Sequence, residues 1–121
     1  MEFELKRVYD IQAPKTHYRV LVDRLWPRGI SKETLELDFW AKSLCPSNEL
    51  RKWFHGDKEG RWKEFCNKYR DELEENEKEI WDFYDKVKSE DKVLLLYAGK
   101  DEKLNHAKVL KETLEYTLLN K

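Results

Sequence analysis

The chain has little of what marks several common classes of protein. Its two cysteines, Cys45 and Cys66, are not spaced as C-x-x-C, which argues against a zinc knuckle or a thioredoxin-type redox site. No apolar run approaches the roughly 20 residues of a membrane-spanning helix, and the opening residues are too polar for a signal peptide. We therefore expect a cytoplasmic protein that keeps its thiols reduced and has no membrane partner.

Neither sign of charge is in excess. Lys and Arg number 24 and Asp and Glu number 25, which gives a formal net charge of -1. Because non-specific nucleic-acid binders usually carry a marked basic excess, this balance argues against that role, while leaving room for a local basic patch. A Gly-rich P-loop and a G-x-G-x-x-G motif are both absent, so the common nucleotide fingerprints are missing and no cofactor is expected.

The residues that are present predict one α/β domain over residues 1–121. A chain of this length buries a real core without disulfides. Phe3–Tyr9 alternates apolar and charged residues, which predicts a strand near a sheet edge. Tyr18–Leu25 and Lys92–Tyr97 are apolar runs that predict central strands, and a continuous run such as the latter is typical of a parallel sheet. We expect these two strands to be adjacent and parallel.

Amphipathic patterns predict helices that flank the sheet. The expected helices cover 47–56, where Ser47 is the cap and Gly56 the end, then 61–75, 80–87 and a last helix that starts at Asp101 or Asn105. Residues 30–44 are predicted to form a short turn followed by an irregular or strand-like segment. The expected fold is a single three-layer α/β domain with a short, mainly parallel sheet flanked by helices.

Charged turns follow both central strands. The first strand runs into Asp23-Arg24-Leu25-Trp26-Pro27-Arg28-Gly29, and the second is followed by Gly99-Lys100-Asp101. If the strands are parallel neighbours, both turns open on the same edge of the sheet. Open α/β sheets usually bind their ligands at that edge, so the sequence predicts a site there.

The first turn supplies the leading candidates for ligand binding. Arg24 and Arg28 flank Trp26, and arginine forks bind carboxylate or phosphate through two parallel N–H bonds. A rigid Pro-Gly turn would hold both arginines in place. In the alternative interpretation, Asp23 pairs with one arginine and only fastens the turn. The two interpretations are compatible, because an aspartate can orient an arginine that faces a ligand.

The second turn adds a cation and candidate proton carriers. Lys100 would bind charge, and Asn105 and His106 open a helix whose N-terminus favours phosphate. His106 and Asp101 are the candidate general acids or bases, with Asp23 as the orienting residue of this catalytic set. In the alternative interpretation, Asp101 or Asn105 is a helix cap and His106 is a packed residue of the first turn.

Other reactive residues carry weaker signals. Lys42, Arg51 and His55 form a looser basic group among aromatic residues. These aromatic residues would stack on nucleic-acid bases or, as is more common, belong to the core. His17 and His55 lack an H-x-x-x-H partner, so no metal site is expected. Cys45 has no histidine tied to it by a motif, which favours a buried structural thiol over a nucleophile.

Several of these motifs together resemble an uncharacterised bacterial and archaeal family. They are Val22–Gly29, Trp40–Lys42, Pro46-Ser47 with Leu50–Phe54, then Trp62, Phe65 and Tyr69, and finally Leu95–Ala98, Lys100-Asp101 and Asn105–Ala107. The chain is similar to the YeaO-like branch of the domain of unknown function 488, and it departs from that pattern at Cys45 and Gly99, where alanines are usual. The resemblance implies a small α/β domain and brings no established activity.

Three functions are compatible with these features. The first is an enzyme or binding protein for an anionic metabolite or phosphate ester, with Arg24, Arg28 and Lys100 binding charge. The second is a nucleic-acid-binding module with Trp26 as a stacking platform, and the third is a protein-interaction domain without chemistry. A concave pocket favours the first, a flat basic face the second and an uncharged apolar patch the third. The near-zero net charge places the first ahead, and the sequence does not give the oligomeric state.

Overall fold

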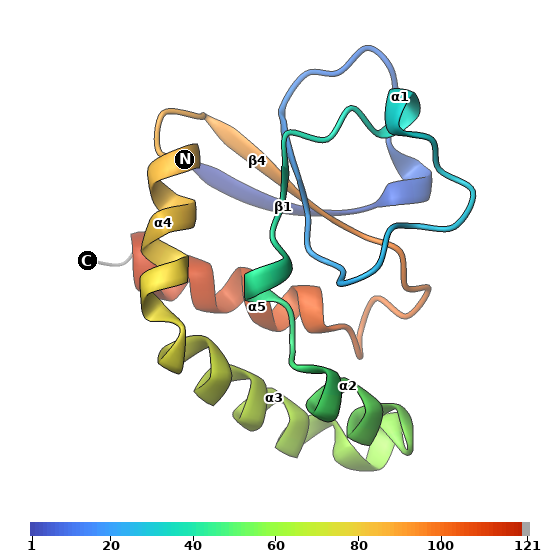
Figure 1. The fold of residues 1–121 in the computed structure, drawn as a ribbon, viewed down its shortest axis with the longest axis vertical. Helices are drawn as coiled ribbons and strands as arrows, with labels where there is room; N and C mark the ends of the chain where they lie inside the picture. Colours follow the sequence, from blue (N-terminus) through green and yellow to red (C-terminus); the bar gives the residue numbers. More distant parts are fainter. Residues whose placement is uncertain (120–121) are drawn as a thin grey trace.

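A four-stranded parallel sheet forms the centre of the computed structural model, which describes residues 1–119 (Figure 1). The strands are β1 (Glu2–Arg7), β2 (Tyr18–Leu21), β3 (Phe39–Trp40) and β4 (Lys92–Tyr97), in the order β1-β4-β2-β3. β2 and β4 are adjacent and parallel, with Val20 opposite Leu95, which confirms the predicted pairing. β1 lies at an edge, as its alternating pattern predicted.

β2 is shorter than the apolar run that contains it. The sequence predicted a strand over Tyr18–Leu25, whereas β2 ends at Leu21. The Val22 N–H still donates to the Leu96 carbonyl at 2.9 Å. The Val22 carbonyl, however, contacts side chains, including Nε2 of His106 at 2.8 Å, in place of a neighbouring strand. The end of the apolar run therefore leaves the sheet and enters the turn that carries the candidate residues.

The segment between β2 and the helices is more ordered than predicted. Its turn is a short helix, α1 (Lys32–Leu35), whose N-cap Ser31 accepts a hydrogen bond from the Thr34 N–H at 3.0 Å. Glu36 then adopts a left-handed conformation with φ 44° and ends α1, so the alternation after Leu35 does not continue as a long strand. Only β3 and a 3₁₀ turn, η2 (Lys42–Leu44), follow before the main helices.

The predicted helices are present with small shifts at their ends. They are α2 (Asn48–His55), α3 (Lys58–Glu75), α4 (Glu77–Val87) and α5 (His106–Leu114), followed by a π-helical turn, η3 (Glu115–Leu119), while a 3₁₀ turn, η1 (Val8–Asp10), follows β1. Ser47 caps α2 as predicted. Of the two starts proposed for the last helix, Asn105 is the N-cap, because its side chain accepts from the Ala107 N–H at 2.8 Å.

The three layers differ in composition. Helices α2 to α5 gather on one side of the sheet, and α1 lies with long connecting segments on the other (Figure 1). The helical side holds the larger core, in which Phe54 and Phe65 stack at 4.2 Å between ring centres. The other side holds a small core of Val8, Leu21, Leu35 and Leu96. This is the predicted three-layer α/β arrangement, and within residues 1–119 no helix has the length and apolar character to cross a bilayer.

Tyr69 of α3 connects the helical layer to the segment that approaches the site. Its side chain is fully buried, and its hydroxyl donates to the Leu44 carbonyl at 2.6 Å. Burial raises the pKa of the Tyr69 phenol well above its usual value, so the hydroxyl keeps its hydrogen. Because Leu44 ends η2, this bond fixes the chain that leads into α2 against the middle of α3.

We expect Tyr69→Phe to lower the free energy of unfolding by about 1–3 kcal/mol, because the buried Leu44 carbonyl loses its donor. Urea unfolding followed by tryptophan fluorescence measures the change. Tyr84→Phe is the matched control, since Tyr84 lies half-buried on α4, and its effect should stay within about 0.5 kcal/mol. Equal stabilities for the two variants would show that the Tyr69 hydroxyl contributes nothing.

Candidate functional site

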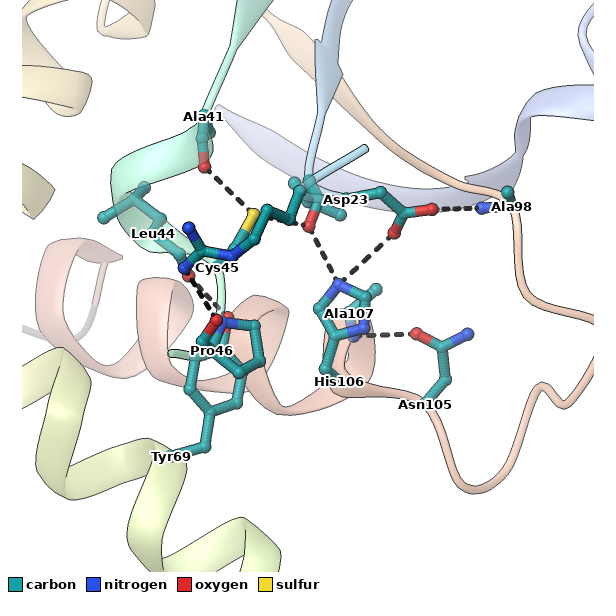
Figure 2. Close-up of polar contacts among 12 residues, drawn as sticks. Asp23, Ala41, Leu44, Cys45, Pro46, Tyr69, Ala98, Asn105, His106 and Ala107 are labelled. Carbon is teal, nitrogen blue, oxygen red and sulfur yellow. Dashed lines mark hydrogen bonds and ion pairs between the residues drawn. The ribbon is translucent and has the colours of Figure 1, made fainter. Parts of the chain in front are cut away.

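Asp23 joins the carboxyl ends of the central strands to the last helix (Figure 2). Its Oδ2 accepts a hydrogen bond from the Ala98 N–H, directly after β4, at 2.9 Å. Its Oδ1 lies 3.3 Å from Nε2 of His106, the first residue of α5. Its backbone carbonyl accepts from Nε1 of Trp40 in β3 at 2.7 Å. One residue thus ties together β2, β3, β4 and α5.

His106 is a packed residue of the first helical turn, with 23% of its side chain exposed. Its Nε2 is 2.8 Å from the Val22 carbonyl, and a carbonyl oxygen only accepts, so Nε2 must carry a hydrogen in this contact. The ring also lies 6.4 Å from that of Tyr69. While the bond to Val22 stands, Nε2 is not available to take a proton. The role of His106 as a general acid or base stays a prediction.

Arg24 and Arg28 occupy different positions in the turn. Arg24 is half-buried and donates to the Pro46 carbonyl at 2.8 Å, which anchors the segment before α2. Arg28 is exposed, and its backbone carbonyl accepts from the Tyr9 hydroxyl at 2.9 Å. Within residues 1–119 neither arginine lies within ion-pair distance of Asp23, so the proposed pairing of that carboxylate with an arginine is not formed.

Trp26 forms a fixed wall between the two arginines. Its Nε1 donates to the Ile30 carbonyl at 2.6 Å, and its ring packs edge-on to Trp40 with 5.6 Å between ring centres. Gly29 has φ 80°, a left-handed conformation that glycine adopts without the strain of a Cβ, and this lets the turn close on itself. Side-chain contacts thus hold Trp26 in the turn, and the rigidity that the Pro-Gly sequence predicted stays a prediction.

The loop from β4 to α5 is shaped by the side chains of Asp101 and Asn105. Oδ1 of Asp101 accepts from the Leu104 and Lys103 N–H groups at 2.9 and 2.8 Å, and these bonds lower the pKa of the Asp101 carboxyl. Asn105 caps α5 and donates from Nδ2 to the Asp101 carbonyl at 3.2 Å. Asn105 is thus the helix cap, one of the two residues that the capping interpretation offered, and Asp101 shapes the loop before the helix. Lys100 is left exposed within it.

A cavity of about 370 Å³ opens at this edge of the sheet. All of the predicted site residues line it, namely Asp23, Arg24, Trp26, Arg28, Lys100, Asp101, Asn105 and His106. The structure therefore brings the two charged turns together as the parallel pairing required. It does not test what they bind, and their roles in binding and catalysis stay predictions.

The helical layer contributes residues that the sequence did not connect to this site. Arg51 and His55 of α2 line the cavity, although the sequence placed them in a separate basic group. Lys58, at the start of α3, and Tyr9, in η1, also line it and were not singled out. Lys42 of the same predicted basic group lies elsewhere, with its ammonium 4.0 Å from the centre of the Trp40 ring. The sequence feature that could have indicated Lys58 is its position directly after Asp57, the N-cap of α3.

The cavity is strongly cationic in a chain that is nearly neutral. Its charged lining consists of Arg24, Arg28, Arg51, Lys58 and Lys100 against the carboxylates Asp23 and Asp101. In the described part of the chain, none of these cations lies within ion-pair distance of a carboxylate. Desolvation, followed by the charges of Lys58 and Arg51, lowers the pKa of His55. The excess of positive charge favours an anion in the cavity.

The cysteines are buried, and Cys45 lies at the cavity. Over residues 1–119 no cluster of His, Cys, Asp and Glu has the composition to hold a metal ion. Cys45 lines the cavity, but its Sγ donates to the Val22 and Ala41 carbonyls at 3.1 and 3.4 Å. Burial, reinforced by the charge of Asp23 and opposed by that of Arg24, raises the pKa of the Cys45 thiol to about 12. Cys66 is also buried, and both cysteines are free.

Comparison with known proteins decides the family. A family model described as the inactive DUF488-N3 subclade matches residues 2–121. The chain belongs to the DUF488-N3 family. It is 45% identical over 114 residues to the uncharacterised protein YeaO of Escherichia coli K12, which covers 94% of this chain and 97% of YeaO.

A second DUF488-N3 relative matches over a shorter stretch. The uncharacterised protein Rv3073c of Mycobacterium tuberculosis H37Rv is 44% identical over 70 residues, or 58% of each chain. No solved structure matches the chain significantly. The resemblance drawn from the sequence motifs is therefore confirmed. The relatives carry no activity with them.

We expect Asp23→Ala to lower the free energy of unfolding by about 1–3 kcal/mol, because the Ala98 N–H loses its acceptor and His106 its contact. Asp23→Asn should cost less, since its amide oxygen can still accept from Ala98. Urea unfolding measures both, with Asp71→Ala on the exposed side of α3 as the control. Equal stabilities for Asp23→Ala and Asp71→Ala would show that the contacts of Asp23 with Ala98 and His106 do not stabilise the fold.

We expect the Cys45 thiol to be alkylated at least about tenfold more slowly than free cysteine near pH 7.5, because its raised pKa keeps it protonated there. The Cys66→Ser variant isolates Cys45, and iodoacetamide labelling is followed by intact mass. Addition of urea should restore the rate of a free thiol. Labelling of the folded variant as fast as free cysteine would show that Cys45 is reactive.

Proposed function

We propose that this DUF488-N3 chain binds a small organic anion, a phosphate ester or a carboxylate, in the cavity at the carboxyl edge of its sheet. The observation that carries the proposal is the set of lining cations without ion-pair partners in the described chain. Charge-assisted hydrogen bonds to phosphate or carboxylate would satisfy them. Arg28, Lys58 and Lys100 are exposed at the cavity and are the contacts that a ligand would reach first.

Binding without chemical conversion is the form of this function that the contacts favour. Nε2 of His106 is engaged with the Val22 carbonyl. Asp23 accepts from a backbone amide, and hydrogen bonds keep Asp101 ionised at neutral pH, where it has no proton to donate. Each of these candidate proton carriers thus makes at least one contact within the fold. The word "inactive" in the description of the matching family model agrees with a binding role.

The two alternatives find weaker support. A nucleic-acid module would present Trp26 as an open platform, whereas its indole is half-buried and packed against Trp40 in the wall of a cavity. An interaction domain would show an uncharged apolar patch away from the turns. A second hollow in the described chain, beside Trp81 and Tyr116, is instead rimmed by charged residues such as Glu77 and Glu112.

Calorimetric titration with ribose 5-phosphate and phenyl phosphate tests the proposal. We expect saturable binding that weakens as salt rises. Lys58→Ala and Arg28→Ala should each weaken it about three- to tenfold, as loss of a ~1 kcal/mol partly exposed charge contact requires. Lys63→Ala is the matched control, because Lys63 is also an exposed lysine of α3 but does not line the cavity.

Each outcome of this titration has a clear meaning. A loss confined to the cavity variants supports anion binding at this site. Equal affinities for Lys58→Ala and Lys63→Ala would place the anion elsewhere on the surface. Absence of heat with every anion at millimolar concentration would refute the proposal.

A further inference from the structure

An exposed tyrosine is held in a fixed position at the mouth of the cavity. Tyr9 of η1 lines the cavity with 45% of its surface exposed. Its hydroxyl donates to the Arg28 carbonyl at 2.9 Å, and the Arg7 guanidinium lies 5.0 Å from the centre of its ring. The Tyr9 ring is therefore exposed to solvent and at the same time held by two contacts.

The contacts of Tyr9 connect it to both charged turns. Arg7 donates from Nε to the Gly99 carbonyl at 3.1 Å and from Nη2 to the Ala98 carbonyl at 3.1 Å. Those carbonyls stand at the start of the loop that carries Lys100, while the Tyr9 hydroxyl holds the backbone of the Arg28 turn. The Arg7 guanidinium lies over the ring, and 45% of the surface of Tyr9 remains exposed. The ring is therefore positioned beside the cations that would hold an anion.

The rest of the lining is too apolar and too large for a bare inorganic ion. A cavity of about 370 Å³ lies in the range of pockets that hold organic ligands, on the order of 300–1,000 Å³. Its apolar wall is formed by Tyr9, Leu25, Trp26, Phe54 and Leu104. Leu25 is 69% exposed in this wall. Such a wall would bury the body of a ligand whose charged group the cations hold.

We infer that the ligand is an aromatic anion, a flat ring system that carries a phosphate or carboxylate group. Its ring packs against Tyr9 and the wall formed by Trp26. Its anionic group lies among Arg28, Lys58 and Lys100. This inference rests on the proposed function and narrows it to one class of anion. Nucleotides and simple aryl acids share this chemistry, and the choice of probes separates them.

Matched pairs of anions, with and without a ring, test the inference by calorimetry. The pairs are AMP against ribose 5-phosphate, phenyl phosphate against inorganic phosphate, and benzoate against acetate. We expect the ring-bearing member of at least one pair to bind about tenfold tighter or more, as the ~1–3 kcal/mol of a stacked ring predicts. Preference confined to AMP assigns a nucleotide, and preference for phenyl phosphate or benzoate over their partners assigns an aryl acid.

Variants of Tyr9 show whether this ring is responsible. Tyr9→Ala and Tyr9→Phe both lose the hydroxyl bond to the Arg28 carbonyl, but only Tyr9→Ala loses the ring, so Tyr9→Ala should remove most of the ring preference. Tyr9→Phe should keep the preference, because the ring remains. Tyr116→Ala is the control, since Tyr116 is 75% exposed but does not line the cavity.

The possible failures are distinguishable. If no anion binds, the proposed function fails and this inference fails with it. If ribose 5-phosphate binds as tightly as AMP, and the other pairs are equally matched, anion binding stands and the aromatic class is wrong. If Tyr9→Ala weakens ring-bearing and ringless anions equally, the ring does not contact the ligand and the inference is overturned.

Discussion

The hydrogen bond from the Ala98 N–H to the Asp23 carboxylate is the contact on which the site depends. β2 ends at Leu21, and the Val22 N–H makes the last backbone bond to β4, so the turn that follows has no strand pairing to hold it beside the end of β4. Asp23 replaces that pairing with a side chain, and its second oxygen meets His106 at the start of α5. The two charged turns and the last helix are thereby held around one cavity.

The contacts of Asp23 and Asp101 affect which groups can pair with the cations of the cavity. Asp23 accepts from a backbone amide and lies outside ion-pair distance of Arg24 and Arg28, and Asp101 is occupied by the loop that it shapes. In the described chain the cations that line the cavity therefore have no carboxylate within ion-pair distance. The contacts that commit Asp23 and Asp101 to the fold thus also leave the nearby cations open to an anionic ligand.

The sequence predicted those features that depend on local pattern. The apolar runs of β2 and β4 located the sheet edge, and Asn105 was one of two named caps. The predicted end of β2 was wrong. Side chains contact the Val22 carbonyl in place of a neighbouring strand, and the hydrophobic pattern does not reveal such contacts. Lys58 and Tyr9 were missed because they reach the cavity only through packing of α3 and η1, segments distant in sequence from both turns.

A concentration of like charge carries a cost that connects the site to the stability of the whole domain. Desolvation is the main cause of the lowered pKa of His55, and repulsion from the charges of Lys58 and Arg51 adds to it. In the free protein this repulsion opposes folding, because the unfolded chain separates the same side chains. An anion that binds only the folded state relieves it and adds a stabilisation that grows with ligand concentration. On the proposed function, repulsion among the cations of the cavity is therefore strongest when the cavity is empty, and a bound anion reduces it.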